Sequence, residues 1–307
     1  MIQASYFPPS EPSVEEFSQL FGEIQVPIEF DVPLALKTTL RAGGRAAVYL
    51  EPRNAIELAL SLETCDRVGL PVRILGAGSN LVIGPGRMES IVISTRKMDL
   101  IQRVGTQIEV GAGAPLIGVI RRSMRWGLSG LETLAGIPAS IGGAMAMNAG
   151  GKYAEFGDFV TDVDLVSPEG QIDTVPVETL KLGYRHSELG GRVVAAVRLQ
   201  LDHGDPSQLQ SRYYEILQEK QFSQPLDRPT AGCIFKNPRP QSAGALIDRA
   251  GLKGFRIGGA RVSKVHANFI ENIGQATARD VLSLMRDVRT KVYERFGTQL
   301  LPEVVLW

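Results

Sequence analysis

The sequence predicts an α+β protein with more than one domain. A chain of 307 residues exceeds the roughly 100–200 residues of a typical domain, so we expect two or three domains. Many short apolar runs are bounded by glycine, which is typical of strands, and apolar residues at helical spacing lie between and after these runs. Hydrophobic residues make up 44% and charged residues 21% of the chain, as in ordinary globular proteins.

The chain begins with an acidic segment. Residues 1–36 contain acidic but no basic side chains, with several prolines, and predict a loosely held extension with one short helix at about 14–21. From Lys37 onward, apolar runs predict strands at 46–50, 72–75, 81–83, 91–94 and 108–110. Helices are expected at 55–67 and 116–126.

The middle of the chain favours a mixed sheet. Two β-prone runs at 160–166 and 171–175 flank Pro168-Glu169-Gly170 and predict a hairpin, and a further strand is expected at 193–201. After His203, the segment Gly-Asp-Pro-Ser starts a helix that runs to about Gln221. This change of pattern places a domain boundary near residue 203.

Two capped helices are expected near the end of the chain. Ser242 is placed to cap a helix that ends at Gly251, and Thr277 to cap a longer one that ends at Gly297. Their apolar residues share one face, which predicts core positions rather than a ligand site.

The charge balance and the rare residue types exclude several classes of function. Lys and Arg together number 33, as do Asp and Glu, so net charge gives no reason to expect a nucleic acid or an anionic membrane as partner. The first basic residue is Lys37 and no apolar run reaches about 18 residues, so we expect a cytoplasmic protein without a signal peptide or membrane span. Two cysteines and three histidines predict neither a disulfide framework nor a metal site.

Three glycine-rich clusters could receive phosphate groups. They span 76–81, 111–113 and 136–143. Glycine lets backbone N–H groups converge on an anion, and Ser79, Asn80 and Ser140 add side-chain donors, so a diphosphate would fit. The alternative is that the glycines serve tight turns. The first cluster lacks the third glycine of the dinucleotide-binding fingerprint, and no P-loop motif occurs, so neither a nicotinamide-type βαβ unit nor P-loop phosphoryl transfer is expected.

Six motifs follow one another in a fixed order. They are Val-Arg-Ile-Leu-Gly-Ala-Gly-Ser-Asn-Leu at 72–81, Leu-Ala-Gly-Ile-Pro-Ala-Ser-Ile-Gly-Gly-Ala at 134–144 with Met-Asn-Ala-Gly at 147–150, Gly-Tyr-Arg-His-Ser at 183–187, Ala-Gly-Cys-Ile-Phe-Lys-Asn-Pro at 231–238, His-Ala-Asn-Phe-Ile at 266–270 and Leu-Pro-Glu-Val at 301–304. From about residue 37 to residue 307 the chain thereby resembles the UDP-N-acetylenolpyruvoylglucosamine reductases, flavoenzymes of peptidoglycan precursor synthesis.

The resemblance implies a division into domains. It implies an FAD-binding unit of the vanillyl-alcohol-oxidase (PCMH) type at 37–203, with subdomains at about 37–100 and 101–203, then a separate α+β substrate-binding domain at 204–300, and a segment at 301–307 that returns a catalytic carboxylate to the flavin. The short path from Arg185 through Gly190-Gly191 to Val193 resembles the shorter branch of the family, which lacks an extra tyrosine-bearing loop.

The resemblance also implies the cofactors and the substrate. FAD would be bound without a covalent bond by Gly76, Ala77, Gly78, Ser79, Asn80, Leu81, Gly136, Ser140, Gly142 and Gly143. NADPH would donate a hydride, and the substrate would be the small molecule UDP-N-acetylglucosamine enolpyruvate, reduced to UDP-N-acetylmuramate. A monomer is expected.

Three motif residues align with the family's catalytic groups. Arg185 aligns with the arginine whose fork holds the substrate carboxylate as enolate-like charge develops, and Glu303 with a glutamate that acts on the same enolate. Cys233 stands where the family most often has the serine that protonates C2 as a general acid. We expect the positive charges of Arg185 and Lys236 to lower the pKa of this thiol.

Further contacts are implied for neighbouring motif residues. Tyr184, Lys236 and Asn237 would contact the substrate, and Asn268 the substrate or the flavin edge. Two positions depart from the family pattern: Ser223 stands where some relatives have a lysine, and Ala139 where glycine is common.

Two other functions are less favoured. Many oxidases of the same FAD-binding fold attach the flavin covalently to a histidine, and this chain has no histidine before residue 186. A non-catalytic nucleotide-binding protein derived from a decayed reductase would be expected to lose the arginine and the glutamate first, and both are present.

Overall fold

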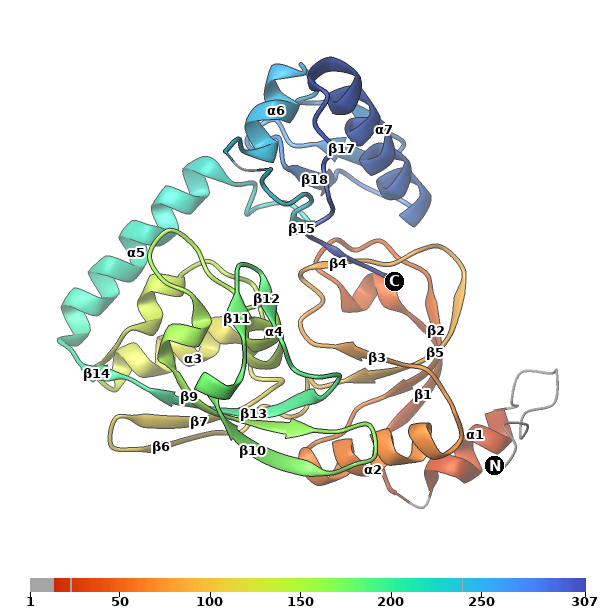
Figure 1. Ribbon diagram of the computed structural model, residues 1–307, viewed down its shortest axis with the longest axis vertical. Coiled ribbons are helices and arrows are strands. Elements are labelled where there is room, and N and C mark those ends of the chain that lie inside the picture. Colours follow the sequence, from red (N-terminus) through yellow and green to blue (C-terminus); the bar gives the residue numbers. More distant parts are fainter. Residues whose placement is uncertain (1–13, 23, 239) are drawn as a thin grey trace.

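The computed structural model describes residues 14–22, 24–238 and 240–307 (Figure 1). Two units, each built on a sheet, lie side by side in the lower part of the view, and a third unit that contains α6 and α7 lies above them. Helix α5 (Pro206–Ser223) runs along one flank and connects the second unit to the third. The part of the expected N-terminal extension before residue 14 lies outside the described residues.

The first unit contains a four-stranded sheet with the order β1-β2-β5-β3. Its strands are β1 (Ile28–Pro33), β2 (Arg45–Leu50), β5 (Arg87–Ser94) and β3 (Val72–Leu75). β1 pairs antiparallel with β2, and the other pairs are parallel. Helix α2 (Ala55–Arg67) has the predicted bounds, and the Asn54 side chain caps it by accepting a hydrogen bond from the Glu57 N–H.

Residues 28–33 belong to this first unit, so residue 37 is not a boundary in the fold. β1 forms the edge strand, with Phe30 opposite Val48. Phe17 and Phe21 of α1 (Val14–Gly22) are buried in the same core. The expectation of a loose extension up to residue 36 is therefore wrong for its described part, because apolar residues alternate along residues 28–32 as an edge strand requires, despite the acidic composition.

The second unit contains an antiparallel sheet with the order β10-β9-β13-β7-β6. Its strands are β10 (Ile172–Pro176), β9 (Val160–Val166), β13 (Val193–Gln200), β7 (Gln107–Gly111) and β6 (Ile101–Val104). Helices α3 (Leu116–Arg125) and α4 (Ile141–Ala146) share a core with this sheet. The hairpin expected around residue 168 is present. β6 was not predicted, because three of its four residues are exposed and give no apolar run.

Several short elements complete the second unit and the entry to the first. They are the 3-10 helices η1 (Leu34–Lys37), η2 (Leu131–Leu134), η3 (Phe156–Phe159) and η4 (Val177–Thr179), the strand pair β8 (Leu128–Ser129) and β14 (Asp202–His203), and the strand pair β11 (Leu182–Gly183) and β12 (His186–Ser187). The turn between β11 and β12 carries Tyr184 and Arg185, which places this pair at the site described below.

The third unit has its own antiparallel sheet and core. The strand order is β15-β18-β17-β16, with β15 (Thr230–Cys233), β18 (Phe269–Asn272), β17 (Ala260–Val262) and β16 (Arg256–Ile257). Helices α6 (Ala243–Arg249) and α7 (Ala278–Phe296) pack with it. Both predicted caps, Ser242 and Thr277, accept the expected backbone N–H. The α+β character of this unit was expected from the resemblance, but the positions of its strands were not predicted, because strands of two to four residues are too short to show a period.

Residues 301–307 connect the first and third units. Strand β19 (Val305–Leu306) pairs in parallel with β4 (Leu81–Val82), which directly follows the first glycine cluster. On the other side, the Glu303 N–H donates to the Ile234 carbonyl at 2.8 Å and the Lys236 N–H to the Leu301 carbonyl at 2.8 Å. Glu303 is therefore fixed in a hydrogen-bonded segment between two units rather than carried on a loose tail.

Candidate active site

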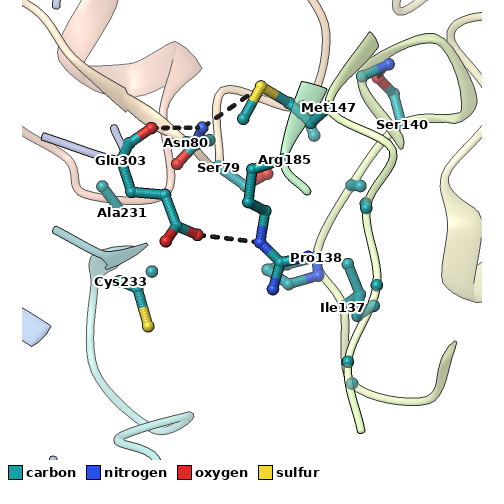
Figure 2. Close-up of a pocket in the computed structure, with 18 of the residues that line it drawn as sticks. Ser79, Asn80, Ile137, Pro138, Ser140, Met147, Arg185, Ala231, Cys233 and Glu303 are labelled. Atoms are coloured by element: carbon teal, nitrogen blue, oxygen red, sulfur yellow. Dashed lines mark hydrogen bonds and ion pairs between the residues drawn. The ribbon is translucent and has the colours of Figure 1, made fainter. Parts of the chain in front are cut away.

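A cavity of about 540 Å³ lies where the three units meet. Its wall is formed by residues of the first and third glycine clusters, the last turns of α5, strand β15 and the segment after residue 302. All the predicted cofactor residues except Gly142 line it, and so do the three predicted catalytic residues. In Figure 2, Arg185, Cys233 and Glu303 come from three different segments, and the Glu303 carboxylate lies beside the Arg185 side chain and above Cys233.

The first glycine loop, residues 76–80, has free backbone donors. The N–H groups of residues 76–79 donate to no acceptor among the residues that the structure describes. The carbonyls are held instead: Arg96 donates to those of Gly76 and Ala77, at 3.3 and 3.2 Å, and the Thr39 N–H donates to that of Gly78 at 3.1 Å. Because unpaired N–H groups at a cavity wall favour an anionic ligand, this loop fits the diphosphate of FAD.

Gly78 is required for the shape of the loop. Its φ of +68° lies in the left-handed region, and a Cβ there would lie 2.5 Å from the Lys37 carbonyl oxygen and 2.9 Å from Thr38 Cα. The resemblance implies that Gly78 binds FAD. In the structure a side chain at Gly78 meets the protein's own backbone first, so the glycine acts by letting the loop approach residues 37–38.

The third glycine cluster, residues 136–143, is called the second glycine loop from here on because it is the second of the two that line the cavity. More of its N–H groups donate to backbone carbonyls of the protein. The Gly142 N–H donates to the Ala112 carbonyl at 2.8 Å, and a Cβ at Gly142 would lie 2.8 Å from that of Ala112. The structure therefore gives Gly142 a packing role rather than the predicted cofactor contact. Ser140 caps α4 by accepting from the Gly143 N–H, and its Oγ lies so near Gly76 that a Cβ there would be 2.3 Å away. Ser140 thus joins the two loops.

Arg185 and Glu303 form an ion pair at the centre of the cavity wall. Arg185 Nε donates to Glu303 Oε1 at 3.0 Å, with side-chain exposures of 23% and 10%. Arg185 has a φ of +56°, a conformation that costs a non-glycine residue free energy and is often found at functional sites. Burial raises the pKa of the Glu303 carboxyl above its ordinary value, and the positive charge of Arg185 opposes this effect.

Cys233 carries a thiol that resists ionisation. Burial, followed by the negative charge of Glu303, raises its pKa to about 12, although Arg185 acts in the opposite direction. The sequence-based expectation of a lowered pKa is therefore wrong, because desolvation of the thiolate outweighs the attraction of nearby cations. The side chain remains a neutral S–H group at physiological pH.

Of the predicted substrate-binding residues, Tyr184 and Lys236 lie beside the ion pair. The ring centroid of Tyr184 is 5.1 Å from Arg185 Cζ, and both Tyr184 and Lys236 lower the pKa of Glu303. Tyr184 is 45% exposed. Neither residue lines the cavity itself, so both are placed at its rim.

The two predicted asparagines have structural hydrogen bonds. Asn268 is 2% exposed, and its amide both accepts from the Phe235 N–H and donates to the Phe235 carbonyl. Asn237 Oδ1 accepts from the Ala243 N–H at the start of α6. Neither asparagine lines the cavity. Asn268 supports the segment that follows β15 through its bonds to Phe235, rather than making the expected contact to substrate or flavin.

The family follows from the comparison with known proteins. Residues 224–307 match the C-terminal domain of UDP-N-acetylenolpyruvoylglucosamine reductase, and residues 46–175 match an FAD binding domain. A UDP-N-acetylenolpyruvoylglucosamine reductase of Synechococcus sp. (strain JA-3-3Ab) is 41% identical over 300 residues, which cover 96% of this chain and 95% of the relative. The chain belongs to the UDP-N-acetylenolpyruvoylglucosamine reductases.

Two further relatives of this reductase family span nearly the whole chain. The protein with this name from Moorella thermoacetica is 39% identical over 298 residues, covering 95% of this chain and 98% of its own length. The crystal structure of UDP-N-acetylenolpyruvylglucosamine reductase from Thermus caldophilus superposes with a TM-score of 0.81 at 38% identity, covering 92% of this chain and 99% of that one. The predicted α+β class, with its FAD-binding unit and separate C-terminal domain, is thereby confirmed.

Sequence reasoning missed two residues that shape the site of this reductase. Arg96 binds the carbonyls of the first glycine loop, and Lys220 of α5 reaches the cavity. Both are ordinary cations in the sequence, and only their place in the fold distinguishes them. Asn80 also has a second task, because its Nδ2 donates to the Glu303 backbone carbonyl at 3.4 Å (Figure 2).

The structure also bears on metal binding and membrane association. Within residues 14–22, 24–238 and 240–307, no group of three or more His, Cys, Asp or Glu side chains is arranged to hold a metal ion. None of the helices in these same ranges is both long enough and apolar enough to cross a membrane.

Proposed function

We propose that Arg185, Glu303 and Cys233 perform the proton and charge handling in the reaction of this family. As a member of the family, the chain is an FAD-dependent oxidoreductase that reduces UDP-N-acetylglucosamine enolpyruvate to UDP-N-acetylmuramate, with NADPH as hydride donor, in peptidoglycan precursor synthesis. The chemistry that bound FAD supplies is hydride transfer, from NADPH to C3 of the enolpyruvyl group.

The first glycine loop holds the cofactor diphosphate in this proposal. The residues that carry its unpaired N–H groups line the cavity, and Arg96 and Ser140 contact the loop and hold its shape. No histidine lines the cavity among the described residues, so the cofactor is held without a covalent bond to histidine.

Arg185 and Glu303 act on the substrate carboxylate. Addition of a hydride at C3 moves an electron pair toward C2 and the carboxylate, and an enolate-like anion develops. The guanidinium of Arg185, already directed by Glu303 at 3.0 Å, binds this negative charge. Glu303 holds the guanidinium in this position as its ion-pair partner, and burial raises the pKa of its carboxyl while the charge of Arg185 opposes this effect.

Cys233 is the proton donor for C2. Its S–H bond breaks as the C2–H bond forms, and the thiolate left behind takes a proton from solvent. A pKa of about 12 keeps the thiol protonated between turnovers, which is the state that a general acid needs.

One observation carries the proposal: the 3.0 Å ion pair and the cysteine share a cavity with a loop of unpaired N–H groups. The purified protein is expected to be yellow, to be bleached by NADPH without air, and to regain its colour when UDP-N-acetylglucosamine enolpyruvate is added. Colour that NADPH bleaches and the enolpyruvyl compound does not restore would contradict the assigned substrate.

The proposal extends to location and assembly. The monomer expected from the sequence remains part of the proposal, and light scattering of the purified protein tests it. The nucleotide-sugar substrate and the two free cysteines support a cytoplasmic location, which fractionation of cells that make the protein checks.

A further inference from the structure

Lys220 extends from the last turn of α5 into the wall of the same cavity. Its Nζ donates to the Ala135 carbonyl at 2.5 Å, and a Cβ built on Gly136 or Gly151 would lie 4.0 Å from that nitrogen. The ammonium group therefore lies between the second glycine loop and the segment that begins at Gly150.

No carboxylate among the described residues neutralises this ammonium. The adjacent Glu219 is engaged elsewhere, because it accepts from Tyr153 Oη at 2.7 Å and pairs with Lys152 at 3.5 Å. Burial, followed by the like charge of Arg185, lowers the pKa of Lys220 to about 8. Among the described residues the ammonium has one acceptor, the Ala135 carbonyl. A positive charge in a partly desolvated wall with a single acceptor is unfavourable unless an anionic ligand completes the site.

We propose that Lys220 Nζ binds the diphosphate of the nucleotide-sugar substrate. The inference rests on the proposed function for the class of substrate. That substrate carries two anionic groups, a carboxylate and a diphosphate. Arg185 is assigned to the carboxylate, and the unpaired N–H groups of the first glycine loop to the diphosphate of FAD. Lys220 lines the same cavity as Arg185, and the charges of the two residues interact, so one substrate can meet both.

The test measures binding of UDP to the FAD-containing protein by calorimetry. Lys220→Gln keeps an N–H donor for the Ala135 carbonyl but removes the charge, whereas Lys220→Arg keeps both. We expect Lys220→Gln to weaken UDP binding by about 10- to 100-fold, since a charge-assisted bond to phosphate is lost, and Lys220→Arg to retain most of the affinity. Lys181→Met removes a lysine whose side chain is 84% exposed and paired with Glu188, and it serves as the matched control without effect.

The pH dependence separates the charge from a packing role. Arg185 faces Lys220 from the β11–β12 turn, and Glu219 and Lys152 are the charged groups beside it. UDP affinity of the unmodified protein is expected to fall as the pH rises through about 8, because the ammonium loses its proton, and the affinity of Lys220→Gln to stay level. UDP itself is fully ionised in this range, because a phosphate has its second pKa near about 6.

Three results would overturn the inference. The first is unchanged UDP affinity in Lys220→Gln with full FAD content, and the second is loss of FAD from Lys220→Gln and Lys220→Arg alike. The third is slower bleaching of Lys220→Gln by NADPH with normal UDP binding, which would assign Lys220 to the NADPH phosphates. Failure of the proposed function has a different signature. In that case the unmodified protein is not reoxidised by the enolpyruvyl compound, while the calorimetry still decides whether Lys220 binds a diphosphate.

Discussion

Arg185 and Glu303 are 118 positions apart in the sequence, yet Arg185 Nε lies 3.0 Å from Glu303 Oε1. The arginine belongs to a turn of the second unit, and the glutamate to a segment hydrogen-bonded to the first and third units. The ion pair therefore forms only when all three units are assembled, and it completes the site at the position where they meet.

Both Arg185 and Glu303 should matter for reoxidation of the flavin by substrate and little for its reduction by NADPH. Arg185→Ala and Glu303→Gln are expected to keep rapid bleaching by NADPH, because no enolate forms in that step. Reoxidation by the enolpyruvyl substrate should slow by about 10²–10³, the usual effect of removing one group that stabilises an anionic transition state. Stopped-flow absorbance measures both halves. Glu188→Gln, at an exposed carboxylate paired with Lys181, is the control, and equal slowing of both halves would contradict the assignment.

Cys233 should be replaceable by serine but not by alanine. Cys233→Ala removes the donor and is expected to slow reoxidation by about 10²–10⁴, the range for a positioned general acid, while Cys233→Ser keeps substantial activity. Reactions in deuterated water add a second measurement, since the unmodified protein should deliver one deuteron to C2 with a single stereochemistry. An alanine variant with normal reoxidation would assign the C2 proton to another group or to an ordered water.

The raised pKa of Cys233 predicts an alkaline profile without a thiol limit. With a pKa of about 12, the donor stays protonated up to at least pH 10, so the substrate half-reaction should not decline there through Cys233. The profiles of Cys233→Ser and the unmodified protein should therefore coincide on the alkaline side, and alkylation by iodoacetamide at pH 8 should be slow. An alkaline limit that disappears in Cys233→Ser would show that the thiol ionises in the folded protein.

Gly78 and Gly69 form a matched pair for the first glycine loop. Both have a φ of +68°, but only a Cβ at Gly78 meets backbone atoms, and nothing lies within 4 Å of one at Gly69. Gly69→Ala should lower the free energy of unfolding by about 1 kcal/mol, the cost of the left-handed conformation. Gly78→Ala should cost more and reduce FAD content, because residues 37–38 and the loop must separate. Denaturant unfolding and the flavin-to-protein ratio measure these effects, and equal losses in both variants would contradict this role for Gly78.

Local features of the fold were predictable, whereas pairing between distant segments was not. Ser242 and Thr277 indicate where their helices begin, because a cap acts within four residues. β1 was missed because the acidic composition of residues 1–36 concealed the alternation of Ile28, Phe30 and Val32. Its pairing with β2 is a contact between separate segments, which the local sequence does not show. The strand positions of the third unit were missed because its strands have only two to four residues.

The candidate site divides in the same way. Arg185, Cys233 and Glu303 were named from motifs, and the structure brings all three to one cavity. The direction of the Cys233 pKa shift was predicted wrongly. The sequence shows the neighbouring cations, which lower the pKa of a thiol, but it does not show the burial in the folded protein, which raises this pKa. Lys220 gave no signal, since nothing in its local sequence distinguishes it from a surface lysine.

The parallel pairing of β19 with β4 has a thermodynamic consequence. Asn80 closes the loop assigned to FAD, and its carbonyl accepts from the Val305 N–H at 2.9 Å while its side chain holds the Glu303 carbonyl. Occupancy of the flavin loop and ordering of the glutamate segment are therefore linked equilibria, and linkage is reciprocal. If FAD binding increases the equilibrium constant for ordering of this segment by some factor, ordering of the segment increases the affinity for FAD by the same factor. Retention of the cofactor and ordering of the segment that carries Glu303 thus share one coupling free energy.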